Sequence, residues 1–454
     1  MLDLIVKNAT VVLKGAQVCC SIAVKNGKIT GLNADNYELD AERVIDAAGK
    51  YVLPGGVDPH VHIRYPGGAH REDFFTGTCA AAAGGTTSII EHPISTPPQY
   101  SPEILKARRD AFLEQAVVDG AFLGAAGGDH LDQIGRVADA GIVGFKTFLH
   151  EPPEGREKEF EGLCCSNTYE LYCALKEISS TGLLAAAHTE DNDMVSNGIR
   201  ELRSKGMTFP RAHCLSRPPV TEVLAVKKLL TLARATEART YLVHISTPEA
   251  VEAALEARAK GQEVYIETCP QYLYMDETWL DKYGTYVKCN PALRSPEMVE
   301  QLWKYVEDGS IDTIGSDHAP YTVAEKERKK EDIFVTPSGF PGLETRGAFI
   351  FKAVKDGRIS LERAVELLSE NPARIFGLVG KGKIEVGYDA DLVILDPYKE
   401  YELKADEMHT KAKDICHFLD GVKVTGKPET VILRGEIIYE NGEVKAEAGY
   451  GRLM

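Results

Sequence analysis

The middle of the chain alternates between short apolar runs and longer amphipathic segments. Short apolar runs between turn residues are typical of buried strands, and apolar positions at helical spacing are typical of helices that face a core. After an opening strand at Leu53, the pattern predicts strands at Thr86–Glu91, Asp119–Ala125, Ile142–Phe148, Gly182–His188, Thr240–Ile245, Glu263–Thr268 and Asp312–Ser316. Helical patterns lie between them, for example at Ser101–Gln115, Asn167–Ile178, Thr221–Ala235, Pro248–Ala259 and Pro296–Glu307.

This alternation predicts an α/β fold. Eight strand units separated by helices, over a span of about 330 residues, fit a (β/α)8 TIM barrel with insertions. We therefore expect a catalytic barrel domain at residues 53–381. A doubly wound open sheet is the alternative, but no Gly-x-Gly-x-x-Gly turn supports it.

Both ends of the chain show a different pattern of predicted elements. Short strand patterns there are separated by turn residues and not by helices. Examples are Val11–Leu13 and Ser21–Val24 near the start, and Ala390–Leu395 and Glu429–Leu433 near the end. Neither end has enough apolar alternation to bury a core alone. We expect residues 1–52 and 382–454 to join into one small β-sandwich domain beside the barrel.

Composition limits the classes of partner. The chain has 454 residues and a net charge of −16 without a Lys/Arg stripe, which argues against nucleic acid. No apolar run approaches the roughly 18 residues of a membrane span, and the first residues lack the apolar core of a signal peptide. The ten cysteines include no Cys-x-x-Cys spacing, and we expect them to be reduced thiols. We expect a cytoplasmic protein without a membrane partner.

Candidate chemistry begins where the opening strand ends, in Val57-Asp58-Pro59-His60-Val61-His62. Residues i and i+2 of a strand project from the same face, so the imidazoles of His60 and His62 can reach one point. Two converging neutral imidazoles are a common start to a transition-metal site. A bare His-x-His is ambiguous by itself, and the later strand ends decide how it is interpreted.

Ionisable residues stand at several other predicted strand ends. The carboxyl ends of barrel strands are where such folds hold their chemistry. The residues found there are His60, His62, His188, His244 and Asp317. Random placement of the twelve histidines would rarely give this arrangement, so the sequence predicts a metal centre at this end of the barrel.

Lys146 lies inside an otherwise apolar strand, Ile142–Phe148. A buried ammonium is costly unless it is paired or modified. A neutral lysine amine can add carbon dioxide to form a carbamate, which places a carboxylate on a long arm that can bridge two cations. A buried lysine paired with a carboxylate is the alternative, and the sequence leaves both open.

These residues and their surroundings resemble the metal-dependent amidohydrolase superfamily. Within it the chain is similar to the cyclic amidohydrolases, which are hydantoinases, dihydropyrimidinases, allantoinases and dihydroorotases. The resemblance covers essentially the whole chain. Its motifs lie at Gly55–His62, Gly144–Lys146, His188–Glu190, Ser216–Pro219, Val243–Ser246, Glu267–Tyr272, Gly315–Pro320 and Gly387–Leu392.

The resemblance implies a set of site residues and a mechanism. It places His60, His62 and Asp317 on the more buried of two divalent metal ions, expected to be zinc, and His188 and His244 on the other. Lys146, as N6-carboxylysine, bridges both. A hydroxide that bridges the metals attacks an amide carbonyl of a cyclic amide or ureide, and Asp317 serves as general base and then general acid. The chain is thus expected to be a hydrolase of carbon–nitrogen bonds in cyclic amides.

The residues expected to determine which cyclic substrate is bound point to different members of the family. Arg64, expected on the metal-facing side of an extended segment, and Asn290 resemble dihydroorotase, in which they would bind a substrate carboxylate. The run Thr87–Ser95 is more similar to hydantoinases and allantoinases. We therefore predict a hydantoinase-, dihydropyrimidinase- or allantoinase-like substrate, with dihydroorotase as the alternative.

Further expected substrate contacts follow from the same comparison. Glu151 stands where dihydropyrimidinases carry an oxyanion-binding tyrosine, which makes His150 a candidate substitute donor. Ser338 and Gly339, in the predicted loop Tyr321–Pro341, complete the set.

A catalytically inactive scaffold related to dihydropyrimidinase is a remote alternative, which the six filled ligand positions oppose. The resemblance also implies a homodimer or homotetramer whose partner is a small cyclic amide or ureide.

Overall fold

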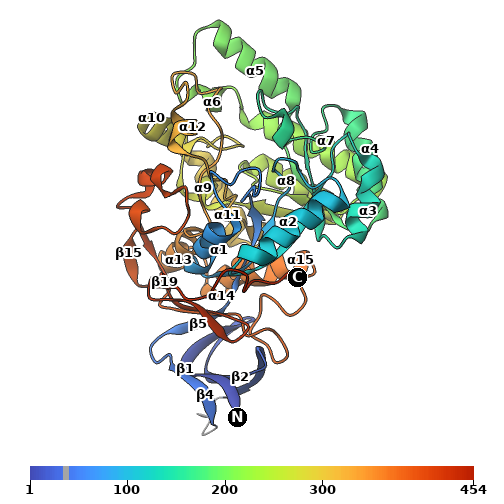
Figure 1. The fold of residues 1–454 in the computed structure, drawn as a ribbon. Helices are drawn as coiled ribbons and strands as arrows, with labels where there is room; N and C mark the ends of the chain where they lie inside the picture. The colour runs from blue at the N-terminus through green and yellow to red at the C-terminus, as the bar shows by residue number, and fades with distance from the viewer. Residues whose placement is uncertain (34–39) are drawn as a thin grey trace.

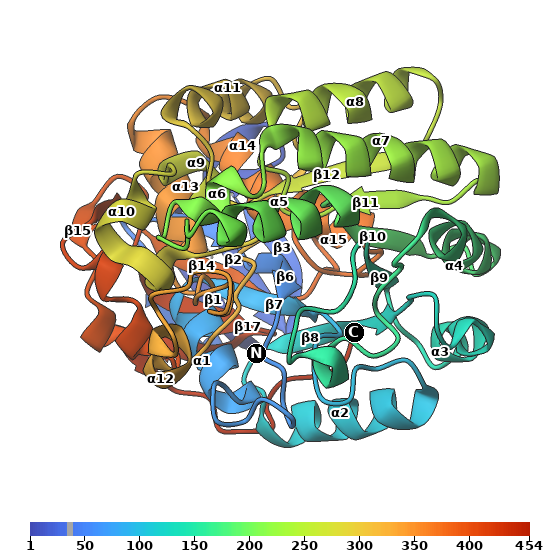
Figure 2. The ribbon, with the colours of Figure 1, turned by 90° about the horizontal axis from the view of Figure 1, so that it is seen from above.

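The computed structural model describes residues 1–33 and 40–454. Eight parallel strands in chain order form the barrel, which Figure 2 shows from above. They are β6 (Gly56–Val61), β7 (Thr86–Glu91), β8 (Asp119–Ala125), β9 (Gly144–Phe148), β10 (Leu184–His188), β11 (Thr240–Leu242), β12 (Val264–Thr268) and β13 (Thr313–Ile314).

The first and last strands meet just beyond their ends. Val61 forms a parallel bridge with His318, and the backbone N–H of His62 donates to the carbonyl of His318 at 2.8 Å. This contact closes the ring of strands, so the predicted TIM barrel is confirmed.

Helices surround the barrel (Figure 2). Ser101 and Ser295 begin two of them, because each serine side chain accepts a backbone N–H of the first turn and a proline follows it. The helices are α1 (Phe74–Ala83), α2 (Pro102–Gln115), α3 (Ile134–Asp139), α4 (Thr168–Ser180), α5 (Asn192–Ser204), α6 (Ala212–Leu215), α7 (Pro219–Thr236), α8 (Pro248–Ala259), α9 (Pro270–Tyr274), α10 (Trp279–Tyr283), α11 (Pro296–Glu307), α12 (Val323–Glu327), α13 (Arg346–Lys355), α14 (Leu361–Val365) and α15 (Asn371–Ile375).

The two ends of the chain share one nine-stranded sheet below the barrel, with blue and red strands side by side in Figure 1. Its order is β19-β18-β17-β14-β5-β1-β2-β3, and β4 pairs with β1. A separate hairpin joins β15 (Glu400–Glu402) and β16 (Lys423–Thr425). The nine strands are β1 (Leu2–Leu13), β2 (Ala16–Lys25), β3 (Lys28–Asn33), β4 (Ala41–Asp46), β5 (Tyr51–Pro54), β14 (Leu392–Leu395), β17 (Pro428–Leu433), β18 (Glu436–Glu440) and β19 (Glu443–Val444).

Strands from the two ends meet where β5 pairs antiparallel with β14, with Val52 opposite Ile394. Side chains from both ends, such as Leu4, Ile22 and Ile432, are buried in one apolar cluster. This shared core explains why neither end carried enough apolar residues alone, and the union of the two ends is confirmed. The domain limits at 52/53 and 381/382 stay a prediction.

A buried ionic network ties the sheet to the barrel. Nζ of Lys381 donates to Oδ2 of Asp119 in β8 at 2.6 Å and to Oδ2 of Asp391, just before β14, at 2.8 Å. Arg434 also pairs with Asp119. Although burial acts in the opposite direction, the two carboxylates raise the pKa of Lys381. The lysine therefore stays charged and holds the two parts together.

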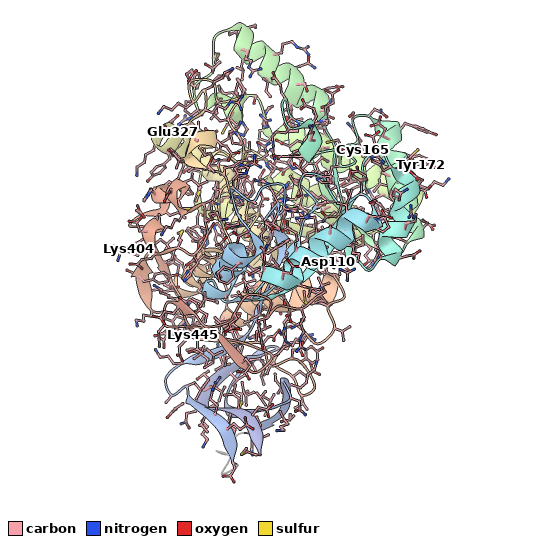
Figure 3. The ribbon with its side chains drawn as sticks, in the orientation of Figure 1. Asp110, Cys165, Tyr172, Glu327, Lys404 and Lys445 are labelled. Atoms are coloured by element: carbon pink, nitrogen blue, oxygen red, sulfur yellow. The ribbon has the colours of Figure 1, made fainter. Side chains whose placement is uncertain are left out.

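On the surface, charges of both signs are interspersed. Asp110, Glu327, Lys404 and Lys445, labelled in Figure 3, each pair with an opposite charge close by in the chain. Among the described residues, no helix combines the length and apolar character that crossing a bilayer requires.

Candidate metal centre

The six predicted ligands come together at the carboxyl end of the barrel. His60 and His188 lie at the ends of β6 and β10, and Lys146 lies in β9. The other three follow their strands by one to three residues: His62 after β6, His244 after β11 and Asp317 after β13. The four histidines and Lys146 are at most 3% exposed, and the Asp317 side chain is 11% exposed. Burial is the main cause that lowers the pKa of each of these imidazoles, and any positive charge on the neighbouring Lys146 acts in the same direction. The histidines are thus neutral and carry lone pairs that can bind a cation.

The first group of ligands converges on one point. Nε2 of His60 lies 3.1 Å from Nε2 of His62. Oδ1 of Asp317 lies 3.3 Å from both nitrogens. Two imidazole nitrogens and a carboxylate oxygen at such separations form one face of a divalent-cation site.

Glu267 in β12 orients this group. Its Oε1 lies 2.7 Å from Nδ1 of His60, while its Oε2 accepts the hydroxyl of Tyr241 at 2.8 Å. A carboxylate that accepts from one ring nitrogen fixes the tautomer and leaves the other nitrogen bare for a metal. Burial raises the pKa of Glu267 to about 8, and the nearby Lys146 opposes this rise.

Gly315 makes room for that contact. A Cβ at this position would lie 2.7 Å from the carboxyl carbon of Glu267 and 2.9 Å from Cβ of His60. Any side chain here would therefore displace the carboxylate or the imidazole that it orients.

The second group consists of His188 and His244. Nδ1 of His188 lies 2.9 Å from Nε2 of His244, and Nε2 of His188 lies 3.0 Å from Oε2 of Glu190. Arg217 lies 3.3 Å from the other oxygen of Glu190. Although burial acts in the opposite direction, Arg217 and His188 lower the pKa of Glu190. The charged carboxylate thus directs Nδ1 of His188 toward His244.

Lys146 lies in β9, which pairs with β10, the strand that ends in His188. It lowers the pKa of histidines in both groups. Within the described residues, nothing hydrogen-bonds to its buried Nζ. Burial lowers the pKa of Lys146, which the carboxylates of Glu267 and Asp317 oppose. A lysine whose amine form is favoured, and which lacks a direct partner, has the properties that carbamate formation requires.

Three residues of the site have left-handed backbones: Arg64 (φ 63°), His244 (φ 42°) and Asp317 (φ 49°). This region is sparsely populated for residues other than glycine, and such residues cluster at functional sites. The expectation that Arg64 lies on an extended segment is wrong, because β6 ends at Val61 and the chain turns.

Glu91 in β7 holds that turn. Its carboxylate accepts the backbone N–H groups of Ile63 and Arg64 at 3.0 and 3.1 Å and pairs with the buried Arg108 at 2.5 Å. The guanidinium of Arg64 then lies 4.5 Å from the centre of the Tyr321 ring and donates to the carbonyl of Pro320 at 2.9 Å. Arg64 is therefore held beside the loop that follows Asp317.

The other predicted substrate contacts lie on two sides of the centre. The half-buried ring of His150 lies 5.1 Å from that of His188. Ser338 donates its hydroxyl to Oδ1 of Asn290 at 3.1 Å. A Cβ on Gly339 would lie 2.6 Å from Cβ of Ala319, two residues after Asp317. The structure thus brings Asn290, Ser338 and Gly339 together near the Asp317 loop.

The sequence analysis missed several residues of this site. Glu267, Glu190 and Arg217 lie in quoted motifs but received no role, and His92 lies in the run Thr87–Ser95, which was used only to compare substrates. The argument applied to Lys146 would have found Glu267, because it too is a charged residue in a buried strand. His92 directly follows the predicted strand Thr86–Glu91, so the strand-end argument applied to His188 and His244 would have singled it out as well.

The amidohydrolase family model matches residues 51–438. Since this match covers most of the chain, the protein belongs to the amidohydrolase family, and the predicted resemblance to its cyclic amidohydrolase branch is confirmed.

Individual relatives extend the match to the whole chain. The L-hydantoinase of Paenarthrobacter aurescens is 35% identical over 457 residues, which are 100% of this chain and 98% of that protein. The allantoinase of Salmonella choleraesuis is 34% identical over 441 residues, covering 96% of this chain and 95% of that protein. The solved L-hydantoinase (dihydropyrimidinase) structure from Arthrobacter aurescens superposes with a TM-score of 0.95 at 34% identity, covering 100% of this chain and 99% of that one.

Proposed function

We propose that this protein is a binuclear metal hydrolase that opens the ring of a cyclic amide or ureide. The observation that carries the proposal is the convergence of His60, His62 and Asp317 beside His188 and His244. Hydantoinase and allantoinase relatives at 34–35% identity support the same reaction class. The filled ligand positions oppose the inactive-scaffold alternative.

The residues present fit two divalent cations. Nδ1 of His188 and Nε2 of His60 are the nitrogens left free by Glu190 and Glu267, and the two groups adjoin, with the rings of His60 and His244 5.3 Å apart. We assign His60, His62 and Asp317 to one cation, His188 and His244 to the other, and Lys146 as N6-carboxylysine to both. Zinc suits this mixture of nitrogen and oxygen ligands.

Two such cations, held by these residues, would lower the pKa of a water molecule and polarise the carbonyl under attack. The protein's own residues then orient the substrate and move the proton. Asp317 accepts the proton of the attacking water and passes it to the leaving ring nitrogen. Burial raises the pKa of Asp317, against the opposing charges of Lys146 and Arg64, which favours its taking up a proton. Nδ1 of His150, beside His188, donates to the backbone carbonyl of Glu151 at 2.6 Å, and burial lowers the pKa of this imidazole to about 4. Its Nε2 is therefore an acceptor, and His150 would donate to the substrate only after taking up a proton.

A second candidate substrate is a ring that carries a carboxylate, as in dihydroorotate. Among the described residues, Arg64 is buried without an acidic group at ion-pair distance, and its Nε has no hydrogen-bond partner. Burying a guanidinium without a counter-ion costs free energy, and a substrate carboxylate would offset that cost by forming an ion pair with Arg64. Asn290 and Ser338 lie on the same side of the centre and would contact such a ring.

A parallel assay tests the proposal. Metal-replete protein is offered hydantoins, dihydrouracil, allantoin and dihydroorotate, and ring opening is followed directly. We expect opening of a neutral ring, with hydantoin- or allantoin-type substrates preferred. Activity on dihydroorotate alone, abolished in Arg64→Ala, would establish the second candidate instead.

The cysteines and the family membership bear on where the protein is found and how it assembles. We propose a cytoplasmic location, because all ten cysteines are free in the structure and a reducing compartment keeps thiols in that state. By similarity to the cyclic amidohydrolases we propose a homodimer or homotetramer, which light scattering of the purified protein would test.

A further inference from the structure

A buried imidazole outside the ligand set joins two segments that lead to the site. His213 in α6 is fully buried, and its two ring nitrogens contact different segments of the chain. Nε2 lies 2.8 Å from the backbone carbonyl oxygen of Cys289, and Nδ1 lies 3.2 Å from Nη1 of Arg217. His213 therefore connects two parts of the site that are far apart in the sequence.

These two contacts define the tautomer of His213. A carbonyl oxygen only accepts, so Nε2 carries the hydrogen and donates it to Cys289. Nδ1 then holds a lone pair, which accepts an N–H of Arg217. Burial lowers the pKa of His213, and the positive charges of Arg217 and Lys288 act in the same direction. The ring is thus neutral, and both of its nitrogens are in use.

The contact through Nδ1 leads to the metal ligand His188. Nη1 of Arg217 donates to His213 and also to the hydroxyl oxygen of Ser216, the latter at 3.0 Å, so this end of the guanidinium has a fixed direction. Nε of Arg217 lies 3.3 Å from Oε1 of Glu190. Oε2 of Glu190 in turn lies 3.0 Å from Nε2 of His188. The direction of the guanidinium thus reaches the second ligand group through one carboxylate.

The contact through Nε2 leads to Asn290. The carbonyl of Cys289 belongs to the peptide group that joins Cys289 to Asn290, so a hydrogen bond to this oxygen restrains the backbone of Asn290. Oδ1 of Asn290 accepts the hydroxyl of Ser338 at 3.1 Å. His213 therefore braces the peptide beside a pair of expected substrate contacts.

We propose that His213 is a positioning residue that holds the Arg217–Glu190 pair and the Asn290 segment in one arrangement. The inference rests on the proposed metal centre and its substrate contacts, and it assigns a role to a residue that binds neither the metal ions nor the ring. Loss of its two hydrogen bonds should weaken metal binding at His188 and substrate binding at Asn290 together. A histidine that only fills space predicts neither change.

Two variants separate hydrogen bonding from packing. His213→Gln keeps an acceptor oxygen and a donor N–H but lacks the ring, whereas His213→Phe keeps a ring but lacks both polar atoms. A positioning role predicts that the glutamine variant stays closer to wild type. A packing role predicts the reverse order.

The experiment combines two measurements. Metal-free protein is loaded with Co²⁺, and the rate of metal release to a chelator is recorded. KM and kcat are then measured with Zn²⁺-replete protein, for the ring that wild type opens best among hydantoin, allantoin and dihydroorotate. For His213→Phe we expect one of the two Co²⁺ ions to leave at least about tenfold faster than from wild type. We expect its KM to rise about fivefold, as the loss of one neutral hydrogen bond would cause. His213→Gln should fall between the two in both measurements.

His409 supplies a matched control, because its ring also joins two segments. Its Nδ1 lies 3.0 Å from Oε1 of Glu344, and its Nε2 lies 3.2 Å from the carbonyl oxygen of Gly442. These partners belong to neither ligand group, so His409→Phe should match wild type in both measurements.

Three results would overturn the proposal. They are a His213→Phe variant that behaves like wild type, one that changes only one of the two measurements, and a glutamine variant that lies further from wild type than the phenylalanine variant. His213→Met replaces the phenylalanine variant if that protein does not fold. Wild type that takes up fewer than two Co²⁺ per chain would contradict the metal centre itself, which is a distinct outcome.

Discussion

The carboxylate of Glu267 holds the imidazole of His60 through Nδ1, at 2.7 Å, and so turns Nε2 toward His62 and Asp317. The two residues are 207 positions apart in the chain and come from β12 and β6. One buried hydrogen bond thus sets the tautomer and the direction of the first ligand.

Replacing Glu267 by glutamine should weaken metal binding. The amide offers Nδ1 of His60 a weaker acceptor than the carboxyl group does, and loss of such partners lowers metal affinity about 10- to 100-fold. Competition with a chelator dye measures this directly. Glu263→Gln is the control, since Glu263 precedes the same strand but pairs with Arg239 at the surface. Equal affinity in the two variants would contradict the orienting role.

Lys146→Arg should take up less than one equivalent of metal and lose activity. The side chain stays long and cationic, but a guanidinium does not form a stable carbamate, so the bridging carboxylate is lost. Metal analysis after dialysis measures the effect. Full metal content and activity in this variant would show that a charged side chain suffices, and would refute carboxylation.

Arg64→Met should discriminate between ring substrates. A charge-assisted hydrogen bond contributes about 1.5–3 kcal/mol, so KM for a carboxylate-bearing ring should rise about 10- to 100-fold while that for a neutral hydantoin changes little. Arg71 lies over the same Tyr321 ring but already binds Glu159 and Glu325, so Arg71→Met is the control. Equal effects on both substrates would remove Arg64 from substrate selection.

Lys381→Met should destabilise the whole protein by about 3–5 kcal/mol, because it leaves Asp391 as an unpaired buried charge. Asp119 would keep Arg434 as its partner. Denaturant unfolding at pH 7 measures this loss. Burial raises the pKa of Asp391, so the deficit should shrink as the pH falls and this carboxylate takes up a proton. Lys260→Met, which touches only an exposed surface pair, should cost less than about 1 kcal/mol.

Much of the fold could be predicted because apolar periodicity reports burial. The strands Thr86–Glu91 and Asp119–Ala125 and the helix Pro248–Ala259 have the predicted bounds. Predictions were less accurate where strands reach the site. β11 ends at Leu242 and β13 at Ile314, before the predicted ends, because the chain turns left-handed at His244 and Asp317. The left-handed positions are occupied by a histidine and an aspartate and not by a glycine, so the apolar pattern alone did not reveal where these strands end.

The ligand candidates could be predicted because barrel strands carry their chemistry at one end. Their supporting residues could not, because those contacts join distant strands. Glu190 follows β10 while Arg217 lies between α6 and α7, so the two meet only in the folded chain. His92 reaches His60 only through the pairing of β6 with β7. The conformation of Arg64 likewise depends on Glu91 from the neighbouring strand.

The most direct test of a binuclear centre is a titration of metal-free protein with Zn²⁺ while ring opening of a hydantoin is followed. We predict activity that is absent without metal, rises with added Zn²⁺ and reaches its plateau at two equivalents per chain. Full activity in metal-free protein, or failure of the native chain to bind Zn²⁺, would contradict the account.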